Sequence, residues 1–253
     1  DVGNTQVHGG VYENEKLKLQ FRKTSSSKSS SDEYGLFLKS VLRENDVEPK
    51  DIRHIAICTV VPDVLYSLKS ACRKYFDNTP FVLQAGVKTG LKIKYRNPVE
   101  VGADRIANSL AAIQMFPDRN IIITDFGTAT TLCVVNKNRE YLGGAILPGV
   151  RMSMHALESQ TAKLPSVEIR KPESVIGRST VESIQSGLYF GQLMMVQGMV
   201  KEIQEEQNWY GDDAPILLTT GGFSSLYDHT KYFHQRVPEL ALTGLFQSLK
   251  LNS

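Results

Sequence analysis

The chain has 253 residues, of which 41% are hydrophobic and 22% are charged, as is typical of a globular protein with one large domain or two of ordinary size. Its 29 basic and 27 acidic residues leave a formal net charge of +2, which gives no electrostatic reason to expect a nucleic-acid or anionic membrane partner. No apolar run approaches the roughly 20 residues of a membrane-spanning helix. We therefore expect small molecules as the ligands.

Cysteine usage predicts a reducing compartment. Cys58, Cys72 and Cys133 are an odd number, have no C-x-x-C spacing, and two of them lie in apolar, strand-like runs. We expect core thiols in a cytoplasmic protein. The sequence begins at Asp1 without a methionine, so we expect a few residues of the first strand to precede it. A removed signal peptide is the alternative, and the thiols argue against it.

The first half of the chain is expected to form a strand hairpin followed by alternating helices and strands. Alternating or continuous apolar residues indicate the strands, and apolar residues at helical spacing indicate the helices. The expected elements are strands over 7–11, 17–22, 55–61, 81–84 and 91–98 and helices over 32–45, 63–76 and 106–113. The run 55–61 is apolar throughout, and strands of this kind usually lie inside a sheet with helices on both faces.

The second half repeats the order of strand, turn, strand, turn and strand found at the start of the chain. Two prolines make residues 162–174 irregular, and three glycines interrupt the long helical stretch 181–207. A strand over 216–220 ends at a pair of glycines, which alone is weak evidence of a nucleotide site. The remaining expected elements are strands over 121–123, 132–135 and 141–149, a helix over 150–159 and a last helix within 237–251.

Two short acidic turns share one pattern. Asp125-Phe126-Gly127-Thr128 lies between two apolar strands, and Asp1-Val2-Gly3-Asn4-Thr5 precedes another. Backbone N–H groups in a glycine turn, with threonine hydroxyls beside them, can surround a phosphate, and a carboxylate at a strand end can hold a cation or its water. The repetition predicts two related halves that bind one polyphosphate.

A third polar segment begins a helix. Gly102 and Ala103 precede Asp104 and Arg105, and a strongly apolar helical run follows. An acid at a helix N-terminus offsets the helix dipole, but an arginine there does not. Because Gly102 would also let a ligand approach the backbone, this segment indicates a binding site rather than a simple helix cap.

The sequence lacks the motifs of the two common nucleotide-binding loops. Neither acidic turn contains the G-K-S/T of a Walker loop, and no G-x-G-x-x-G follows a strand. With no lysine in either turn, bound cations must balance the phosphate charge, and Asp1 and Asp125 are the natural places for them. Phosphoryl transfer needs alignment, charge neutralisation and a carboxylate that receives the acceptor's proton, and Asp104 suits that last role.

Four motifs follow one another along nearly the whole chain. They are Asp1-Val2-Gly3-Asn4-Thr5; Tyr95-Arg96-Asn97-Pro98 with Gly102-Ala103-Asp104-Arg105; Asp125-Phe126-Gly127-Thr128-Ala129-Thr130; and Gly143-Gly144-Ala145-Ile146-Leu147-Pro148-Gly149. Together they resemble the bacterial type III pantothenate kinases. The resemblance implies the α/β fold of the acetate and sugar kinase/actin superfamily, with mixed sheets flanked by helices. It further implies two ribonuclease H-like domains, which we place at residues 1–117 and 118–253, with a cleft between them, and a homodimer.

The resemblance also implies an activity, namely the ATP-dependent phosphorylation of pantothenate to 4'-phosphopantothenate in the first step of coenzyme A synthesis. Mg²⁺ and a monovalent cation, K⁺ or NH₄⁺, would be required. Asp104 would accept the substrate proton, Asp125 would bind the monovalent cation, and Asp1 is our own candidate for Mg²⁺. The implied ATP contacts are Asp1, Val2, Gly3, Asn4, Thr5, Gln6, Val7, His8 and Thr128. The implied pantothenate contacts are Tyr95, Gly102, Ala103, Asp104, Arg105 and Thr180, with Thr180 reaching over from a second subunit.

Other functions share parts of this pattern. A sugar kinase, an actin-like ATPase or a polyphosphate phosphatase would also carry paired acidic turns, and the segment from Gly102 to Arg105 near Tyr95 is what separates them. A non-catalytic nucleotide-binding regulator is a further alternative, because some relatives of the family have been described as regulatory factors. Retention of Asp1, Asp104 and Asp125 argues for catalysis, since a pure binder needs no proton acceptor.

Overall fold

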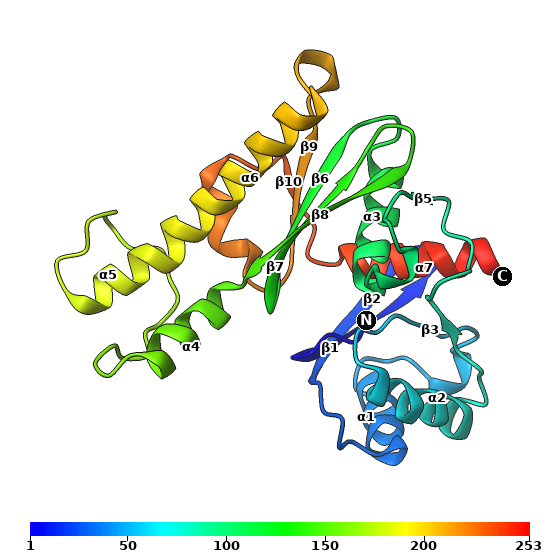
Figure 1. Cartoon of the computed structure of the whole chain (residues 1–253). Helices are drawn as coiled ribbons and strands as arrows, with labels where there is room; N and C mark the ends of the chain where they lie inside the picture. Colours follow the sequence, from blue (N-terminus) through cyan, green and yellow to red (C-terminus); the bar gives the residue numbers. More distant parts are fainter. The chain divides into compact units, whose positions relative to one another are not determined.

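The computed structural model describes residues 1–253, which divide into two compact units (Figure 1). Unit 1 comprises residues 1–90, 96–111 and 240–253, and unit 2 comprises residues 91–95 and 112–239. The C-terminal helix therefore belongs with the N-terminal part of the chain. The predicted domains 1–117 and 118–253 are contiguous in sequence, and they stay a prediction.

The hairpin predicted at the start of unit 1 is confirmed. Strands β1 (Gln6–Glu13) and β2 (Lys16–Thr24) pair antiparallel. Asn14 and Glu15 make the tight turn between them, both with positive φ. This turn fixes the register of the hairpin, so that His8 lies opposite Arg22.

Two helices follow the hairpin, close to their predicted bounds. Helix α1 (Ser31–Arg43) begins with a capping box, in which the Ser30 hydroxyl accepts from Glu33 N at 3.2 Å and Ser30 N donates to Glu33 Oε2 at 2.6 Å. Helix α2 (Pro62–Phe76) starts with the proline, whose missing N–H costs nothing at this position. The short 3₁₀ turn η1 (Pro49–Asp51) lies between α1 and α2 in sequence.

The predicted long buried strand 55–61 is wrong in extent. Strand β3 spans only Ala56–Ile57 and pairs in parallel with β4 (Phe81–Val82), and these two strands form a sheet of their own. The Thr59 hydroxyl accepts from Val61 N at 2.9 Å and donates to Val61 O at 3.1 Å. Such local side-chain hydrogen bonds compete with sheet pairing, and they turn the chain toward α2.

Two further helices contribute to unit 1, although the last four residues of α3 belong to unit 2. The 3₁₀ turn η2 (Pro98–Glu100) precedes α3 (Ala103–Met115), and α7 (Leu240–Asn252) ends the chain. The rings of Tyr12 and Phe246 stack with centroids 4.3 Å apart, which fixes α7 against the hairpin. Helices α3 and α7 share a core cluster with the residues that follow β3 and β4: Cys58, Leu83, Ala107 and Leu245.

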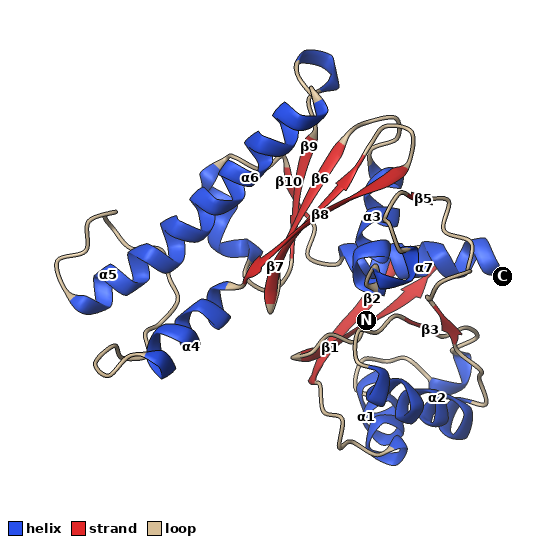
Figure 2. Cartoon of the chain, viewed as in Figure 1, coloured by secondary structure: helices blue, strands red, loops and turns tan.

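Unit 2 is built on a six-stranded mixed sheet in the order β10-β9-β6-β7-β8-β5 (Figure 2). Strand β9 runs parallel to both β6 and β10, β7 is antiparallel to β6 and β8, and β5 is parallel to β8. The strands are β5 (Lys92–Ile93), β6 (Ile121–Phe126), β7 (Ala129–Val135), β8 (Glu140–Pro148), β9 (Ile216–Thr220) and β10 (Gln235–Arg236).

The long helical stretch of unit 2 is divided by a π-helical turn. Helix α5 (Thr180–Ser186) passes through a π turn (Gly187–Gly191) into α6 (Gln192–Gln207), and α6 packs along the sheet through Leu193, Val196 and Val200. Helix α4 (Val150–Gln160) follows β8, and residues 161–179 are irregular, which includes the predicted irregular segment 162–174. Two 3₁₀ turns flank β9: η4 (Gly211–Asp213) and η5 (Ser224–Thr230).

The two units share a pattern of strand connections. In unit 1, Val2 bridges antiparallel to Val7 and parallel to Thr59. In unit 2, β6 pairs antiparallel with β7 and parallel with β9. In each unit, the segment that carries the acid pairs antiparallel with the strand after the turn. The same segment also pairs in parallel with a segment far away in the sequence. This repetition supports the inference of two related halves.

Two predictions about the whole chain can also be compared with the structure. All three cysteines are buried thiols, as predicted. None of the helices combines the length and the apolar character needed to cross a lipid bilayer.

Candidate functional site

Backbone hydrogen bonds fix the first acidic turn in unit 1. Val2 is buried, its N–H donates to Cys58 O at 2.9 Å, and its carbonyl accepts from Val60 N at 3.1 Å. The Asp1 carbonyl accepts from His8 N at 2.8 Å. The turn itself closes through Gly3 N, which donates to Gln6 O at 3.0 Å. Asp1 therefore sits on a rigid support, while the next residues, 4–6, are exposed.

The Asp1 carboxylate has a buried partner. Cys58 Sγ donates a hydrogen bond to Asp1 Oδ1 across 3.3 Å, and Cys58 has no exposed surface. Burial raises the pKa of the Cys58 thiol, and the negative charge of Asp104 raises it further. The thiol therefore keeps its proton at neutral pH and can act as a donor.

Asp104 occupies the first turn of α3, where a negative charge is favourable. Its Oδ1 accepts from Arg105 N at 2.8 Å. A Cβ added to Gly102 would lie 2.4 Å from this same oxygen, so a side chain there would force the carboxylate to move. The Arg105 side chain donates from Nη2 to Glu100 O at 3.4 Å, which ties it to η2.

Unit 1 thus contains two carboxylates that are 103 positions apart in sequence. Asp1 is hydrogen-bonded to Cys58, and Asp104 lies close enough for its charge to act on the same thiol. Both carboxylates are partly exposed, whereas Cys58 is buried. Sequence reasoning identified both acids but treated Cys58 only as a core residue, because no local pattern links it to Asp1.

The second acidic turn lies at the carboxyl end of β6. Asp125 pairs with Thr131 on β7 and with Thr220 on β9, and Gly127 N donates to Ala129 O at 3.1 Å to close the turn. Thr128 is exposed at its tip. Because β6 and β9 are parallel, their carboxyl ends meet at one edge of the sheet, and α/β proteins commonly bind ligands there.

The loop that contains the glycine pair after β9 packs against Asp125. Gly221 has φ of 89°, and a Cβ at this position would lie 2.3 Å from Asp125 Oδ1. The Gly221 carbonyl accepts from the Ser224 hydroxyl at 2.7 Å, and Phe223 N donates to Phe126 O at 3.0 Å. These bonds hold the loop against the acidic turn. A side chain at Gly222 would meet nothing within 4 Å, so the backbone there is open to a ligand.

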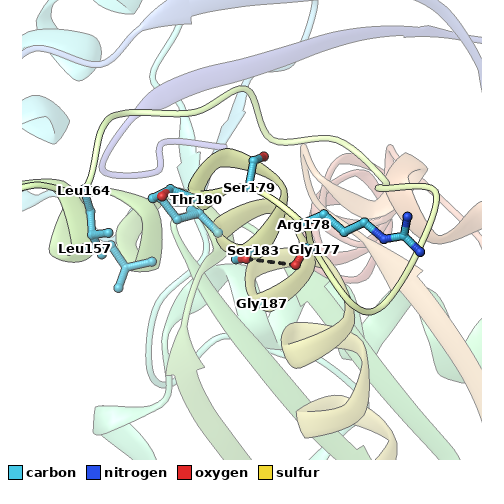
Figure 3. Close-up of a pocket in the computed structure, with 9 residues that line it drawn as sticks. Leu157, Leu164, Gly177, Arg178, Ser179, Thr180, Ser183 and Gly187 are labelled. Atoms are coloured by element: carbon cyan, nitrogen blue, oxygen red, sulfur yellow. Dashed lines mark hydrogen bonds between the residues drawn. The ribbon is translucent and has the colours of Figure 1, made fainter.

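Two predicted substrate residues lie elsewhere in unit 2. The ring of Tyr95 is half-buried, with its centroid 6.3 Å from that of Tyr141. Thr180 is exposed at the start of α5 and lines a pocket of about 700 Å³ with Leu157, Leu164 and Ser183. Figure 3 shows Arg178 extending away from Thr180 at this pocket. No other predicted site residue lines this pocket.

His8, the last residue of the predicted first phosphate loop, is a buried side chain. Its Nε2 lies 3.1 Å from Gln20 Oε1. Burial lowers the pKa of His8 to about 4, and the positive charge of Arg22 contributes to the shift. The imidazole is therefore neutral at physiological pH and adds no positive charge to the phosphate loop.

The cations that the family resemblance implies can be compared with the ligand atoms that the structure provides. No group of three or more His, Cys, Asp or Glu side chains is arranged to hold a metal ion. Mg²⁺ does not need such a group, since it usually keeps several waters and takes one or two carboxylates together with substrate phosphates. The half-exposed carboxylate of Asp1 fits that requirement. Asp125 suits a monovalent cation through its partly exposed carboxylate, which lies at the carboxyl end of β6.

Comparison with known proteins gives consistent results. The family model described as type III pantothenate kinase matches residues 1–202. A type III pantothenate kinase of Legionella pneumophila (strain Corby) is 57% identical over 253 residues, which cover 100% of this chain and 98% of that protein.

Two solved structures share the fold. A Campylobacter jejuni protein, described in its structure as belonging to the Baf family of transcriptional activators, has a TM-score of 0.60 at 18% identity and covers 98% of this chain and 95% of its own. The ROK hexokinase from Thermus thermophilus has a TM-score of 0.50 at 12% identity and covers 98% and 96%. The predicted α/β fold, with mixed sheets flanked by helices, is confirmed, and the sugar kinase structure shares it.

Proposed function

Because this chain belongs to the type III pantothenate kinase family, we propose that it transfers a phosphoryl group from ATP to pantothenate and so forms 4'-phosphopantothenate, the first step of coenzyme A synthesis. The match to a kinase of this name extends over the whole chain at 57% identity. The structural observation that supports the proposal most is that unit 1 holds both Asp1, which is hydrogen-bonded to Cys58, and Asp104, which is in the first turn of α3. A carboxylate for the cation and a carboxylate for the proton are thus held in the same unit.

Asp104 is proposed to accept the proton of the pantothenate hydroxyl. Phosphoryl transfer passes through a loose transition state, so the enzyme mainly aligns the reactants and neutralises charge. Asp104 is partly exposed, and one carboxylate oxygen is held by Arg105 N, which fixes its direction. The first turn of a packed helix is a rigid place for such a group.

The two acidic turns are proposed to contact ATP. The segment from Asp1 to His8 presents exposed backbone at residues 4–6, and Thr128 is exposed at the tip of the other turn. Neither turn contains a lysine, so cations would balance the phosphate charge. When bound, Mg²⁺ at Asp1 and K⁺ or NH₄⁺ at Asp125 would neutralise negative charge on the nucleotide.

Pantothenate is proposed to be held by Tyr95, by the segment from Gly102 to Arg105, and by Thr180 of the partner subunit. Arg105 is our candidate for the substrate carboxylate, because a planar guanidinium can form two parallel hydrogen bonds with that anion. In the structure, Glu100 O already orients this side chain.

A homodimer would explain the exposed apolar side chains near α5 and α6. Five large hydrophobic residues on or next to this helical stretch are more than 40% exposed: Val175, Ile176, Val181, Met194 and Met195. A cluster of exposed apolar residues commonly marks a protein–protein interface. Thr180 lies among them in sequence, so a second copy bound at this surface could receive it. A cytoplasmic location, where the thiols would stay reduced, remains part of the proposal.

The main alternative is a non-catalytic regulator. The Campylobacter jejuni structure carries a regulatory description, but at 18% identity the likeness shows the fold alone. Sugar kinases share the fold as well. The presence of Asp104, whose carboxylate would be displaced by any side chain at Gly102, favours a catalyst over a pure binder.

A coupled ADP-release assay tests the proposal. We expect ADP to appear only when ATP, Mg²⁺ and pantothenate are all present, to depend on K⁺ or NH₄⁺, and to be matched by a product with the mass of 4'-phosphopantothenate. Glucose in place of pantothenate is the control for a sugar kinase. Equal ADP release without pantothenate would favour an ATPase, and no release with either acceptor would favour the regulator.

A further inference from the structure

A buried thiol touches one of the site carboxylates. Cys58 Sγ lies 3.3 Å from Asp1 Oδ1, and the residue is fully buried in a cluster with Leu83, Ala107 and Leu245. A core cysteine would normally act as a small hydrophobic residue. Here its S–H bond points at a carboxylate, which is the best acceptor that a weak donor can find.

The backbone around this contact is held from both sides. Cys58 O accepts from Val2 N at 2.9 Å, and Val60 N donates to Val2 O at 3.1 Å. Asp1 O also accepts from His8 N at 2.8 Å, so the main chains of Asp1 and Cys58 cannot shift without breaking these bonds. The remaining freedom of Asp1 is the rotation of its side chain, and the thiol favours the rotamer that places Oδ1 on Sγ.

We propose that Cys58 is a positioning residue for Asp1. By holding Oδ1, it directs the other carboxylate oxygen, Oδ2, toward the cation that accompanies ATP. This inference rests on the proposed function, in which Asp1 serves the Mg²⁺ of the nucleotide.

Binding of MgATP, measured by isothermal titration calorimetry, tests the proposal without turnover. Cys58→Ala removes the donor, and we expect its MgATP dissociation constant to rise about 5-fold, the usual effect of one hydrogen bond. Cys58→Ser keeps a donor and should restore most of the affinity. Cys72→Ala is the matched control, since Cys72 is also a buried thiol of unit 1 and should leave MgATP binding unchanged.

A double-mutant cycle separates positioning from packing. In an Asp1→Asn background, Cys58→Ala should have no further effect on MgATP binding, because the carboxylate that it orients is gone. Thermal unfolding of each variant shows whether it folds, and a loss of stability shared by Cys58→Ala and Cys72→Ala is expected from the lost side-chain volume alone.

Three results would overturn the positioning role: unchanged MgATP affinity in Cys58→Ala, equal weakening in Cys58→Ser and Cys58→Ala, or a full effect of Cys58→Ala in the Asp1→Asn background. Each of these leaves the proposed kinase function standing if the wild-type protein binds MgATP and releases ADP with pantothenate. Failure of the wild-type protein in both respects would overturn the proposed function, and the role of Cys58 with it.

Discussion

Oδ1 of Asp125 lies where a side chain on Gly221 would have to be: a Cβ there would be 2.3 Å from it. Gly221 also has φ of 89°, which disfavours any other residue. Strand β9 is thus followed by a glycine because the Asp125 carboxylate and the backbone of Phe126, whose carbonyl carbon would be 2.6 Å from the Cβ, occupy the space. We therefore consider the two residues together as parts of the proposed monovalent-cation site.

Gly221→Ala should therefore displace the Asp125 carboxylate and strain the backbone. We expect a loss of about 1–3 kcal/mol in the free energy of unfolding, together with a higher K⁺ concentration for half-maximal ADP release. Gly222→Ala is the matched control, because a Cβ there meets nothing within 4 Å. If the two variants needed the same K⁺ concentration for half-maximal ADP release, Gly221 would have no role in the cation site.

Asp104→Asn keeps the shape of the side chain and removes its ability to take a proton. We expect kcat for pantothenate phosphorylation to fall by roughly 10²-fold or more, the usual effect of losing a positioned base, with MgATP binding retained. Asp63→Asn is the control, since Asp63 is also in the first turn of a helix. Steady-state kinetics give the answer, and near wild-type turnover in Asp104→Asn would mean that the proton goes elsewhere.

Arg105→Lys keeps the charge but loses the planar, two-pronged donor. We expect KM for pantothenate to rise about 10-fold, because each tenfold change needs only about 1.4 kcal/mol and a bidentate contact can supply that. KM for ATP should not change. Arg43→Lys, at the last turn of α1, serves as the control. An unchanged KM for pantothenate would refute the assignment of Arg105 to the substrate carboxylate.

Stability should depend on pH through His8. The pKa of His8 is about 4 in the folded protein against an ordinary value of 6.5, so on acidification the unfolded chain takes up this proton first. The stabilising contribution is complete above pH 6.5 and is lost as pH falls from 6.5 toward 4. Urea unfolding across this range should show a smaller pH dependence in His8→Gln than in wild type or in His54→Gln, an exposed control. Parallel curves for all three would contradict the prediction.

The oligomeric state should depend on α6. Met194 and Met195 are 55% and 43% exposed, and the double variant Met194→Glu/Met195→Glu would place two charges in the proposed interface. We expect light scattering after size-exclusion chromatography to report a dimer for wild type and a monomer for this variant. Leu36→Glu, at a position 61% exposed on α1, should stay dimeric. A dimeric α6 variant would place the interface elsewhere.

Regular elements could be predicted from the sequence because their signals are local. The helical spacing over 32–45 and 63–76 identified α1 and α2 to within two residues. The polar tip with Asn14 and Glu15 identified the hairpin. Strand β10 was not predicted, because Gln235 and Arg236 are both polar and exposed and show no apolar alternation.

What the sequence could not reveal depends on contacts between distant segments. The strand expected over 55–61 is short because the Thr59 hydroxyl bonds to Val61, which competes with pairing. Helix α7 joins unit 1 because Leu245 packs with Cys58 and Ala107, far away in sequence. The π turn within 181–207 falls between two of the glycines that interrupt the pattern, Gly187 and Gly191, but glycine spacing alone does not specify a π turn.

The candidate site, like the fold, could be predicted only where its signals are local in the sequence. The acids Asp1, Asp104 and Asp125 could be identified because each lies in a short motif with its glycine. Their partners could not, since Cys58 is 57 positions from Asp1 and Gly221 is 96 positions from Asp125. The predicted roles of Tyr95 and Thr180 stay predictions.

The central claim is that both acidic turns take part in binding one nucleotide. Isothermal titration calorimetry of MgATP with wild type, Asp1→Asn, Asp125→Asn and Asp104→Asn tests it most directly. We expect one ATP per chain in wild type, affinity at least about 10-fold weaker in each of the two turn variants, as for loss of a charged contact, and near wild-type affinity in Asp104→Asn. Wild-type affinity in either Asp1→Asn or Asp125→Asn would contradict the account.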